Sequence, residues 1–264
     1  MDIQHYFPEN EQPLDQLLSD GGFCGILRTI ACVGDSLSSG EFETCDEKGE
    51  HHYFDMFDYS WGQFMARICG NTVYNFSRGG MTAWEYVHSF AEQSGFWAPE
   101  KAAQAYIIAL GVNDISSALR GDIELGTVAD IDLSDPEKNR ETFAGYYGRI
   151  IQRYRAISPD AKFFIMTPPR GEQGEDRVKM ADQLSDLLRD IAALWPEAYV
   201  IDLHRYAPVY DAQFRTKFYL NGHLNPCGYV LTAKMVVSYL DYIIRHNMKD
   251  FEFIWQKNLP AAQK

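Results

Sequence analysis

The sequence predicts an α/β protein, a single large domain in which helices cover both faces of a parallel sheet. Five short apolar segments have the length of strands, amphipathic segments of helical period separate them, and 264 residues suit one domain. Where strands and helices alternate, right-handed crossovers join the strands into a parallel sheet with helices on both faces. The sequence contains no internal repeat and no sign of a second domain.

The expected strands are rich in β-branched and other apolar side chains and are bounded by turn residues. The first is followed by Gly34, which permits a tight turn, and then by Asp35, Ser36 and Leu37. The five strands are expected over residues 28–33, 72–75, 105–110, 162–167 and 199–203.

Between the strands, apolar residues recur at helical spacing. One such segment ends at Gly70, a residue typical of helix C-caps, and another begins with Pro136, which suits a first helical turn. The expected helices span residues 59–69, 83–93, 136–157, 176–194 and 230–246.

The remaining segments are connections and chain ends. Residues 120–135 are expected to be irregular, and residues 204–220 are expected to form a loop. We expect residues 1–25 to form an arm packed on a domain of residues 26–248, with 249–264 as a tail.

Residues 41–58 lie directly downstream of Ser36, have no clear period, and carry seven acidic side chains against one lysine. We expect a loop at the rim of any pocket near Ser36, although a solvated surface loop without function has the same composition. The segment contains the pair His51-His52. Adjacent residues do not easily face one ion and no third ligand is evident, so no metal site is predicted.

Charge and cysteine content narrow the partners and the compartment. A net charge of −13 disfavours binding to nucleic acid or to an anionic membrane. The five cysteines are odd in number and lack metal-ligand spacing, and the N-terminus lacks the pattern of a signal peptide. We therefore expect reduced thiols and a cytoplasmic protein. No segment approaches the roughly 18 apolar residues that a membrane span needs.

Polar or glycine-rich turns follow four of the five expected strands. Ser36 follows the first strand, Gly80 the second, Asn113 the third and His223 the fifth. Ligands of open α/β sheets bind beyond the carboxyl ends of the strands, so these residues are expected at one edge. A serine on such a turn has an exposed hydroxyl and a free backbone N–H, two properties that a nucleophile can use. Each turn alone is ordinary, and the candidate site depends on all four.

The residues around these turns resemble the four sequence blocks of the SGNH (GDSL) hydrolases. The blocks are Gly34-Asp-Ser-Leu37, Asn75 with Gly80 five residues later, Gly111-Val-Asn-Asp114, and His223 followed by Gly228-Tyr229. They occur in the family's order and extend over most of the chain. The resemblance implies a flavodoxin-like three-layer α/β/α sandwich with strand order 2-1-3-4-5. It also implies hydrolysis of a small-molecule ester or thioester without a cofactor.

The resemblance further implies a role for each matching residue. Ser36 would attack the acyl carbon, and His223 would act as general base and then protonate the leaving alcohol. The negative oxygen of the tetrahedral intermediate needs preorganised donors. These would be the N–H groups of Ser36 and Gly80 and the side-chain amide of Asn113.

One position departs from the family pattern. The family usually places an aspartate three residues before the histidine, where this sequence has Leu220. The ring of His223 would then be held by Asn221, by the main-chain carbonyl of Leu220, or by a distant acid such as Asp202 or Asp211. An amide stabilises an imidazolium less than a carboxylate does. A non-catalytic binding protein that retains the pocket is therefore an alternative. A flavin-binding protein is a weaker one, because an acidic segment after the first strand disfavours a phosphate.

Four further residues are expected to contact the substrate of such an enzyme: Asp35, Tyr53, Phe54 and Arg170. The carboxylates of 41–58 would repel an anionic acyl donor, which favours small acyl groups on a neutral alcohol such as a carbohydrate. Lysophospholipase or thioesterase activity, within the same family, is the alternative.

Overall fold

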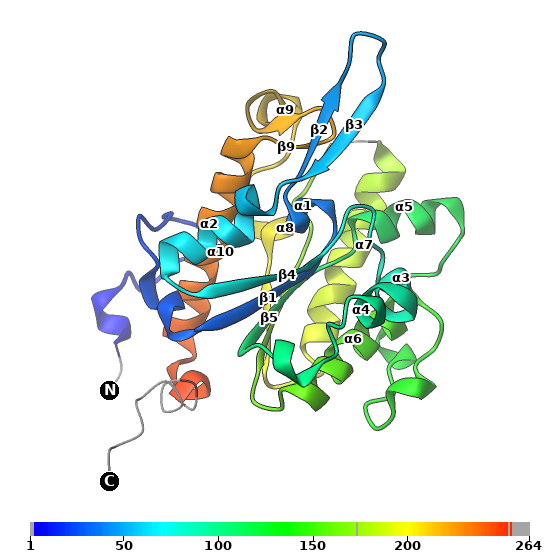
Figure 1. The fold of residues 1–264 in the computed structure, drawn as a ribbon. Coiled ribbons are helices and arrows are strands. Elements are labelled where there is room, and N and C mark those ends of the chain that lie inside the picture. Colours follow the sequence, from blue (N-terminus) through cyan, green and yellow to red (C-terminus); the bar gives the residue numbers. More distant parts are fainter. Residues whose placement is uncertain (1–2, 173, 253, 255–264) are drawn as a thin grey trace.

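The computed structural model describes residues 3–172, 174–252 and 254 of the chain. Its centre is a five-stranded parallel sheet with β1 between β4 and β5 (Figure 1). The spatial order is β4 (Thr72–Ser77), β1 (Thr29–Gly34), β5 (Ala105–Ala109), β6 (Lys162–Met166) and β7 (Ala198–Ile201). Counted among these five strands alone, this is the order 2-1-3-4-5, so the predicted fold class and strand order are confirmed.

Both faces of the sheet are buried, as its strand sequences require. In β1, Ala31 and Val33 lie in one apolar core, whereas Ile30 and Cys32 lie in the other. Successive side chains of a strand point to opposite faces, so a strand between two cores is apolar throughout. The first core is covered by residues 83–93, α5 (Val112–Arg120), α6 (Phe143–Ile157) and α7 (Glu175–Ala192). The second is covered by η2 (Gly22–Ile26), α2 (Trp61–Cys69), α9 (Ala212–Phe218) and α10 (Pro226–His246) (Figure 1).

The helix expected over 83–93 is present but contains a π-helical turn. It runs through α3 (Ala83–Glu85), η4 (Tyr86–Phe90) and α4 (Ala91–Gln93). The turn begins at Tyr86, whose buried hydroxyl lies 2.6 Å from the hydroxyl of Tyr154 on α6. This contact ties the irregular helix to its neighbour.

The expectation of an irregular loop over 41–58 is wrong. These residues form an antiparallel hairpin of β2 (Glu41–Cys45) and β3 (His51–Asp55), followed by the short turn η3 (Phe57–Tyr59). The hairpin projects beyond the carboxyl ends of the central strands (Figure 1). Its strands satisfy their backbone groups by pairing with each other, and β3 is exposed along its whole length. The long apolar runs that reveal a core strand are therefore missing from its sequence.

The helix expected over 136–157 begins later than predicted. Pro136 opens a separate short turn, η7 (Pro136–Lys138), whereas α6 begins at Phe143. The cap is Thr142, whose side chain accepts a hydrogen bond from the N–H of Gly145. A capping side chain satisfies a donor that a helix start leaves free, and it fixed the boundary here more strongly than the proline did.

Residues 204–220 are not a loop. They include most of α8 (Leu203–Tyr206), all of α9, and the short strand β8 (Tyr219–Leu220). Asp211 caps α9 by accepting a hydrogen bond from the N–H of Phe214. This segment brings the chain back over the second core before it reaches His223.

The N-terminal residues pack along α10. The N–H of Leu18 donates to the hydroxyl of Ser238, and the N–H of Phe23 donates to the carboxylate of Asp241. Buried Arg245 bonds Glu11. All five cysteines are free thiols. Of the tail expected over 249–264, residues 253 and 255–264 lie outside the described residues.

In the described part of the chain, one helix is long and apolar enough, by length and composition alone, to cross a membrane. This helix is α10, and 72% of its apolar window is buried inside the protein. The apolar residues of α10 are therefore packed in the second core.

Candidate active site

Ser36 lies at the carboxyl end of β1 as the first residue of the one-turn helix α1 (Ser36–Ser39). Asp35 caps this helix by accepting a hydrogen bond of 3.0 Å from the N–H of Leu37. The first N–H groups of a helix have no intrahelical partner, so Ser36 offers a backbone donor beside its hydroxyl. Within the described residues, that hydroxyl makes no hydrogen bond.

His223 comes from β9 (His223–Leu224), which pairs with β8 and contacts α1. The elements that carry Ser36 and His223 are thus neighbours beyond the sheet edge, although the two residues are far apart in sequence. The imidazole is mostly buried, with 16% of its side-chain surface exposed. The rings of Tyr53 and His223 meet edge to face at a centroid distance of 5.8 Å.

Glu43 of β2 holds the Nδ1 atom of His223. Its Oε2 atom lies 2.8 Å from Nδ1 and also accepts a hydrogen bond of 2.7 Å from the N–H of Gly222. Its Oε1 atom lies 2.6 Å from Nδ1 of His51. Burial raises the pKa of Glu43, but the hydrogen bonds from His223, His51 and Gly222 outweigh it, so the pKa is below its ordinary value. A carboxylate that stays charged against Nδ1 can orient an imidazole and stabilise its cation.

The structure therefore corrects the residues expected to orient His223. Asn221 donates its side-chain amide to the main-chain oxygen of Glu43, so it holds the backbone of Glu43 and not the ring of His223. Leu220 faces His223 across the β8–β9 pair, while Nδ1 is bound to Glu43. Asp202 is bound by Arg189 and by the hydroxyl of Thr167. The remaining candidate, Asp211, is the cap of α9.

A second carboxylate lies on the other side of the same ring. Oε1 of Glu41 is 3.0 Å from Nε2 of His223, and the side chain of Glu41 is only 13% exposed. Burial raises the pKa of Glu41, and the charges of Asp55 and Glu43 add to that effect while His223 opposes it. Glu41 and Glu43 are two residues apart on one strand, so both side chains face the histidine.

Two of the three predicted oxyanion donors, the backbone N–H of Gly80 and the side-chain amide of Asn113, lie on neighbouring segments of the chain in space. Gly80 has φ of +72°, and a Cβ atom built on it would meet no atom within 4 Å. The glycine is therefore explained by its left-handed backbone, and the space beside it is open. Asn113, at the start of α5, donates its side-chain amide to the main-chain oxygen of Met81 at 3.1 Å. This bond fixes the amide beside the Gly80 turn.

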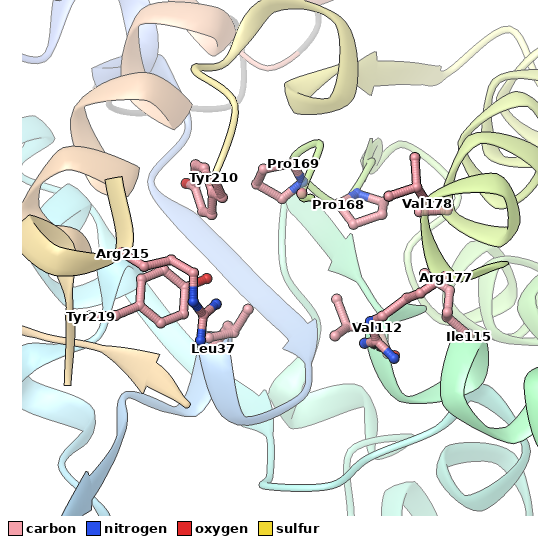
Figure 2. A pocket seen from close by; sticks show the side chains of 12 residues that line it. Leu37, Val112, Ile115, Pro168, Pro169, Arg177, Val178, Tyr210, Arg215 and Tyr219 are labelled. Atoms are coloured by element: carbon pink, nitrogen blue, oxygen red, sulfur yellow. Dashed lines mark hydrogen bonds between the residues drawn. The ribbon is translucent and has the colours of Figure 1, made fainter. Parts of the chain in front are cut away.

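A cavity of about 120 Å³ is lined by Leu37, the residue that follows Ser36 in the chain (Figure 2). Leu37, the neighbour of Ser36, and Val112, the neighbour of Asn113, form part of its wall. The rest of the lining is mostly apolar and comes from Ile115, Pro168, Pro169, Gly171, Arg177, Val178, Ala181, Tyr210, Arg215 and Tyr219.

The four residues expected to contact substrate have different surroundings. Asp35 is buried and lines a smaller cavity of about 30 Å³, which shares Leu37 with the larger one. Tyr53 lies at the rim beside His223. Phe54 pairs with Phe42 across the hairpin, on the face opposite to Tyr53 and Glu43, so it does not face the histidine.

Arg170 lies between two residues that line the larger cavity, but its side chain is exposed and is not part of the lining. Its main-chain oxygen accepts a hydrogen bond from the N–H of Tyr210.

The two adjacent histidines of the hairpin diverge. His51 bonds Glu43, whereas His52 lies near Asp46 and Glu50, with ligand atoms of these three exposed residues within 4.8 Å of one another. In the sequence alone, no third ligand is evident beside His51 and His52. Exposed acidic groups of this kind are common on protein surfaces, and nothing else in the described structure directs an ion to them.

Sequence reasoning missed both glutamates on the histidine. The available signal was the alternation Glu41-Phe42-Glu43 directly after Gly40, which places two acids on one face of a strand and an aromatic on the other. Three residues are too short a pattern to stand out in a segment with seven acidic side chains.

Several solved structures share this fold at low sequence identity. A family two carbohydrate esterase from Clostridium thermocellum, in complex with cellohexaose, is 17% identical, with a TM-score of 0.57 over 84% of this chain and 65% of that chain. A carbohydrate acetylesterase from Sinorhizobium meliloti is 14% identical, with a TM-score of 0.55 over 82% of this chain and 99% of that chain. A lipase/acylhydrolase from Enterococcus faecalis is 17% identical, with a TM-score of 0.51 over 83% and 96%.

Similarity at these identities establishes the fold. A comparison with curated protein sequences found no significant match. The family itself is given by the sequence match of residues 32–231, which include Ser36, Asn113 and His223, to the GDSL-like lipase/acylhydrolase family. The chain therefore belongs to this family of ester-hydrolysing enzymes.

Proposed function

We propose that this protein is a serine esterase that releases small acyl groups from a neutral, hydroxyl-rich alcohol such as a carbohydrate, through an acyl-enzyme on Ser36. The observation that carries the proposal is the 2.8 Å contact between Glu43 and Nδ1 of His223, on an element in contact with the helix of Ser36. An imidazole fixed at Nδ1 presents Nε2 as a base.

In the acylation step, the Ser36 hydroxyl attacks the acyl carbon and its proton passes to Nε2 of His223. The charge of Glu43 stabilises the imidazolium that forms. The oxyanion accepts hydrogen bonds from the N–H groups of Ser36 and Gly80 and from the amide of Asn113. The intermediate then collapses, the bond to the alcohol breaks, and the alcohol leaves with the proton from His223.

Deacylation repeats these steps with water as the nucleophile. His223 removes a proton from the water as it attacks the acyl carbon of the ester on Ser36. The second tetrahedral intermediate uses the same oxyanion donors. When it collapses, Ser36 recovers its proton from His223 and the carboxylic acid is released. No cofactor is required by this sequence of steps.

The cavity beside Leu37 supports a small acyl group. Its volume is about 120 Å³, and an apolar cavity of about 150 Å³ holds one benzene molecule. An acyl chain of up to about five carbons fits by the same measure. A long acyl chain, as in a lysophospholipid, would extend out of this partly open space.

The acids around His223 support a neutral alcohol. Glu41, Glu43 and Asp55 share one face of the hairpin, because they alternate along β2 and β3. Carboxylates beside the catalytic histidine repel an anionic substrate. Among the structural neighbours, five are described as carbohydrate esterases, a carbohydrate acetylesterase or an acetyl xylan esterase. The non-catalytic alternative rests on the missing aspartate. The contact of Glu43 with Nδ1 of His223 supplies a carboxylate in its place.

A fluorophosphonate probe, which labels activated serines, tests the nucleophile. We expect one label per chain in the wild type and none in Ser36→Ala. Absence of labelling in a folded wild-type protein would contradict the esterase proposal.

Paired substrates test the charge preference. Ethyl butanoate and the monoethyl ester of succinic acid have acyl groups of four carbons each and differ in the charge of the acyl group. We expect faster turnover of the neutral ester, with a difference that shrinks as salt screens the carboxylates. A preference for the anionic ester would overturn this part of the proposal.

A further inference from the structure

The side chain of Glu41 lies against Nε2 of His223, the atom that would protonate the leaving alcohol. Its Oε1 atom lies 3.0 Å from Nε2 of His223. Its Oε2 atom lies against Gly79, where any side chain would collide with it. The carboxylate therefore sits between the base and the turn that carries Gly80.

This carboxylate has little compensation for its burial. In the described part of the protein, no backbone or side-chain group donates a well-aligned hydrogen bond to either of its oxygens. Burial raises its pKa, and the neighbouring Asp55 and Glu43 disfavour its charge further. The cationic or N–H-bearing edge of His223 is the one favourable partner among the described residues.

The mechanism proposed above removes this partner, and the inference rests on that mechanism. Nε2 must accept the proton of Ser36 and then donate it to the leaving oxygen. While it does so, its N–H points at the reacting atoms and is not available to Glu41. A mostly buried carboxylate is then left without a donor, which is costly unless the substrate supplies one.

We propose that Glu41 is a specificity-determining residue that accepts a hydrogen bond from a hydroxyl group of the leaving alcohol adjacent to the ester oxygen. Carbohydrates and other polyols carry such a hydroxyl, whereas simple alcohols and their ethers do not. A polyol ester would donate its hydroxyl to Glu41 while Nε2 of His223 is engaged with the reacting atoms. An ester without that hydroxyl would leave Glu41 without a donor. Discrimination against a missing hydrogen-bonding group is the strong kind of enzyme specificity.

Two acetate esters of equal acyl group test the proposal: 2-hydroxyethyl acetate, which carries the hydroxyl, and 2-methoxyethyl acetate, in which it is methylated. The ratio of their kcat/KM values reports the acylation step, in which the alcohol leaves. We expect the wild type to prefer the hydroxyl ester by about ten- to a hundredfold, the range of one hydrogen bond to a charged group.

The variant Glu41→Ala removes the acceptor. Its ratio of kcat/KM values should approach the ratio of the rates at which the two esters hydrolyse without the enzyme. Glu41→Gln keeps a neutral acceptor and should retain part of the preference. The control is Glu47→Ala, which removes an equal charge from the exposed turn of the same hairpin and should leave the wild-type ratio unchanged.

The outcomes separate this inference from the esterase proposal. If the wild type cleaves both esters without preference, or Glu41→Ala keeps the preference, Glu41 does not read the alcohol. If Glu41→Ala accelerates both esters equally, the carboxylate only blocks Nε2, which also overturns the inference. If neither ester is cleaved and Ser36 takes no fluorophosphonate, the esterase proposal itself has failed.

Discussion

Nδ1 of His223 lies 2.8 Å from Oε2 of Glu43, a residue 180 positions earlier in the chain. The acid that orients the histidine thus comes from the β2–β3 hairpin and not from the loop of the histidine itself, where the family usually has it. Because Glu43 also accepts the N–H of Gly222, it positions both the ring and the backbone that carries it.

Replacing this acid tests the arrangement. Glu43→Gln should lower kcat by about 10³- to 10⁴-fold, because an amide does not stabilise the imidazolium and can favour the wrong tautomer of His223. The measurement is the hydrolysis of a small acetate ester, with circular dichroism as the check on folding. His51→Ala, which removes a half-exposed partner of the same carboxylate, should cost about fivefold at most. Equal losses in both variants would contradict the role of Glu43.

Asn113 provides a test of the oxyanion donors. Asn113→Ala should lower kcat by about 10²- to 10³-fold, the usual effect of losing one such donor, with little change in KM. The bond to Met81 is also lost, which should lower the free energy of unfolding by about 1 kcal/mol. Asn75→Ala removes a comparable turn bond, to the N–H of Ser77, and should reproduce the stability loss alone. A fall in kcat of the same size in both variants would show that turn geometry is the cause.

The buried acids Asp35 and Asp114 make stability depend on pH. Burial raises the pKa of each from 3.8 to about 7, against the opposing hydrogen bonds from the N–H groups of Leu37 and Ala83. A raised pKa means that the folded state binds protons which the unfolded state has already lost. Stability is therefore highest below about pH 4 for these groups and falls as the pH rises through 7, by roughly 4 kcal/mol for one such shift.

Urea unfolding at pH 5 and pH 8 measures this slope. We expect the wild type to be less stable at pH 8, and Asp114→Asn to show a smaller loss between the two pH values. The carboxylates whose pKa is lowered, such as Glu43 and Asp202, titrate below this window. Stability that rises from pH 5 to pH 8 would contradict the prediction.

The cavity beside Leu37 predicts the acyl preference. Turnover of 4-nitrophenyl esters should fall once the acyl chain exceeds about five carbons. Val178→Ala widens the cavity on the side of α7 and should extend the range by one or two carbons. Val209→Ala, at an exposed position outside the lining, is the matched control and should leave the range unchanged. An unchanged chain-length profile in Val178→Ala would show that the acyl group binds elsewhere.

The sequence was sufficient for the sheet and for the edge at which the site lies. The core strands are long apolar runs, and residues at their ends, such as Ser36 and Asn113, are placed by topology once the strands are known. The strand order came from the family resemblance, because periodicity does not encode which strands are neighbours.

The hairpin and its two glutamates could not be predicted in this way. The strands β2 and β3 are stabilised by their mutual pairing and by a single buried aromatic, Phe42, so their sequence lacks a core pattern. The contact between Glu43 and His223 depends on where the hairpin docks, which no local propensity reports. Leu220 stands where the family usually has the aspartate that orients the histidine. Glu43, which is distant in sequence, takes that role here.

The hairpin also carries several parts of the site as one unit. The backbone of Glu41 is held by the hydroxyl of Tyr229, and Asp55 on the partner strand is held by the hydroxyl of Ser39. A small tilt of this ribbon would shift Glu41 and Tyr53, and with them the imidazole of His223 that Glu43 holds, while the central sheet stays still. Enzyme efficiency and substrate choice are therefore mechanically linked here, and changes that loosen the ribbon should degrade both at once.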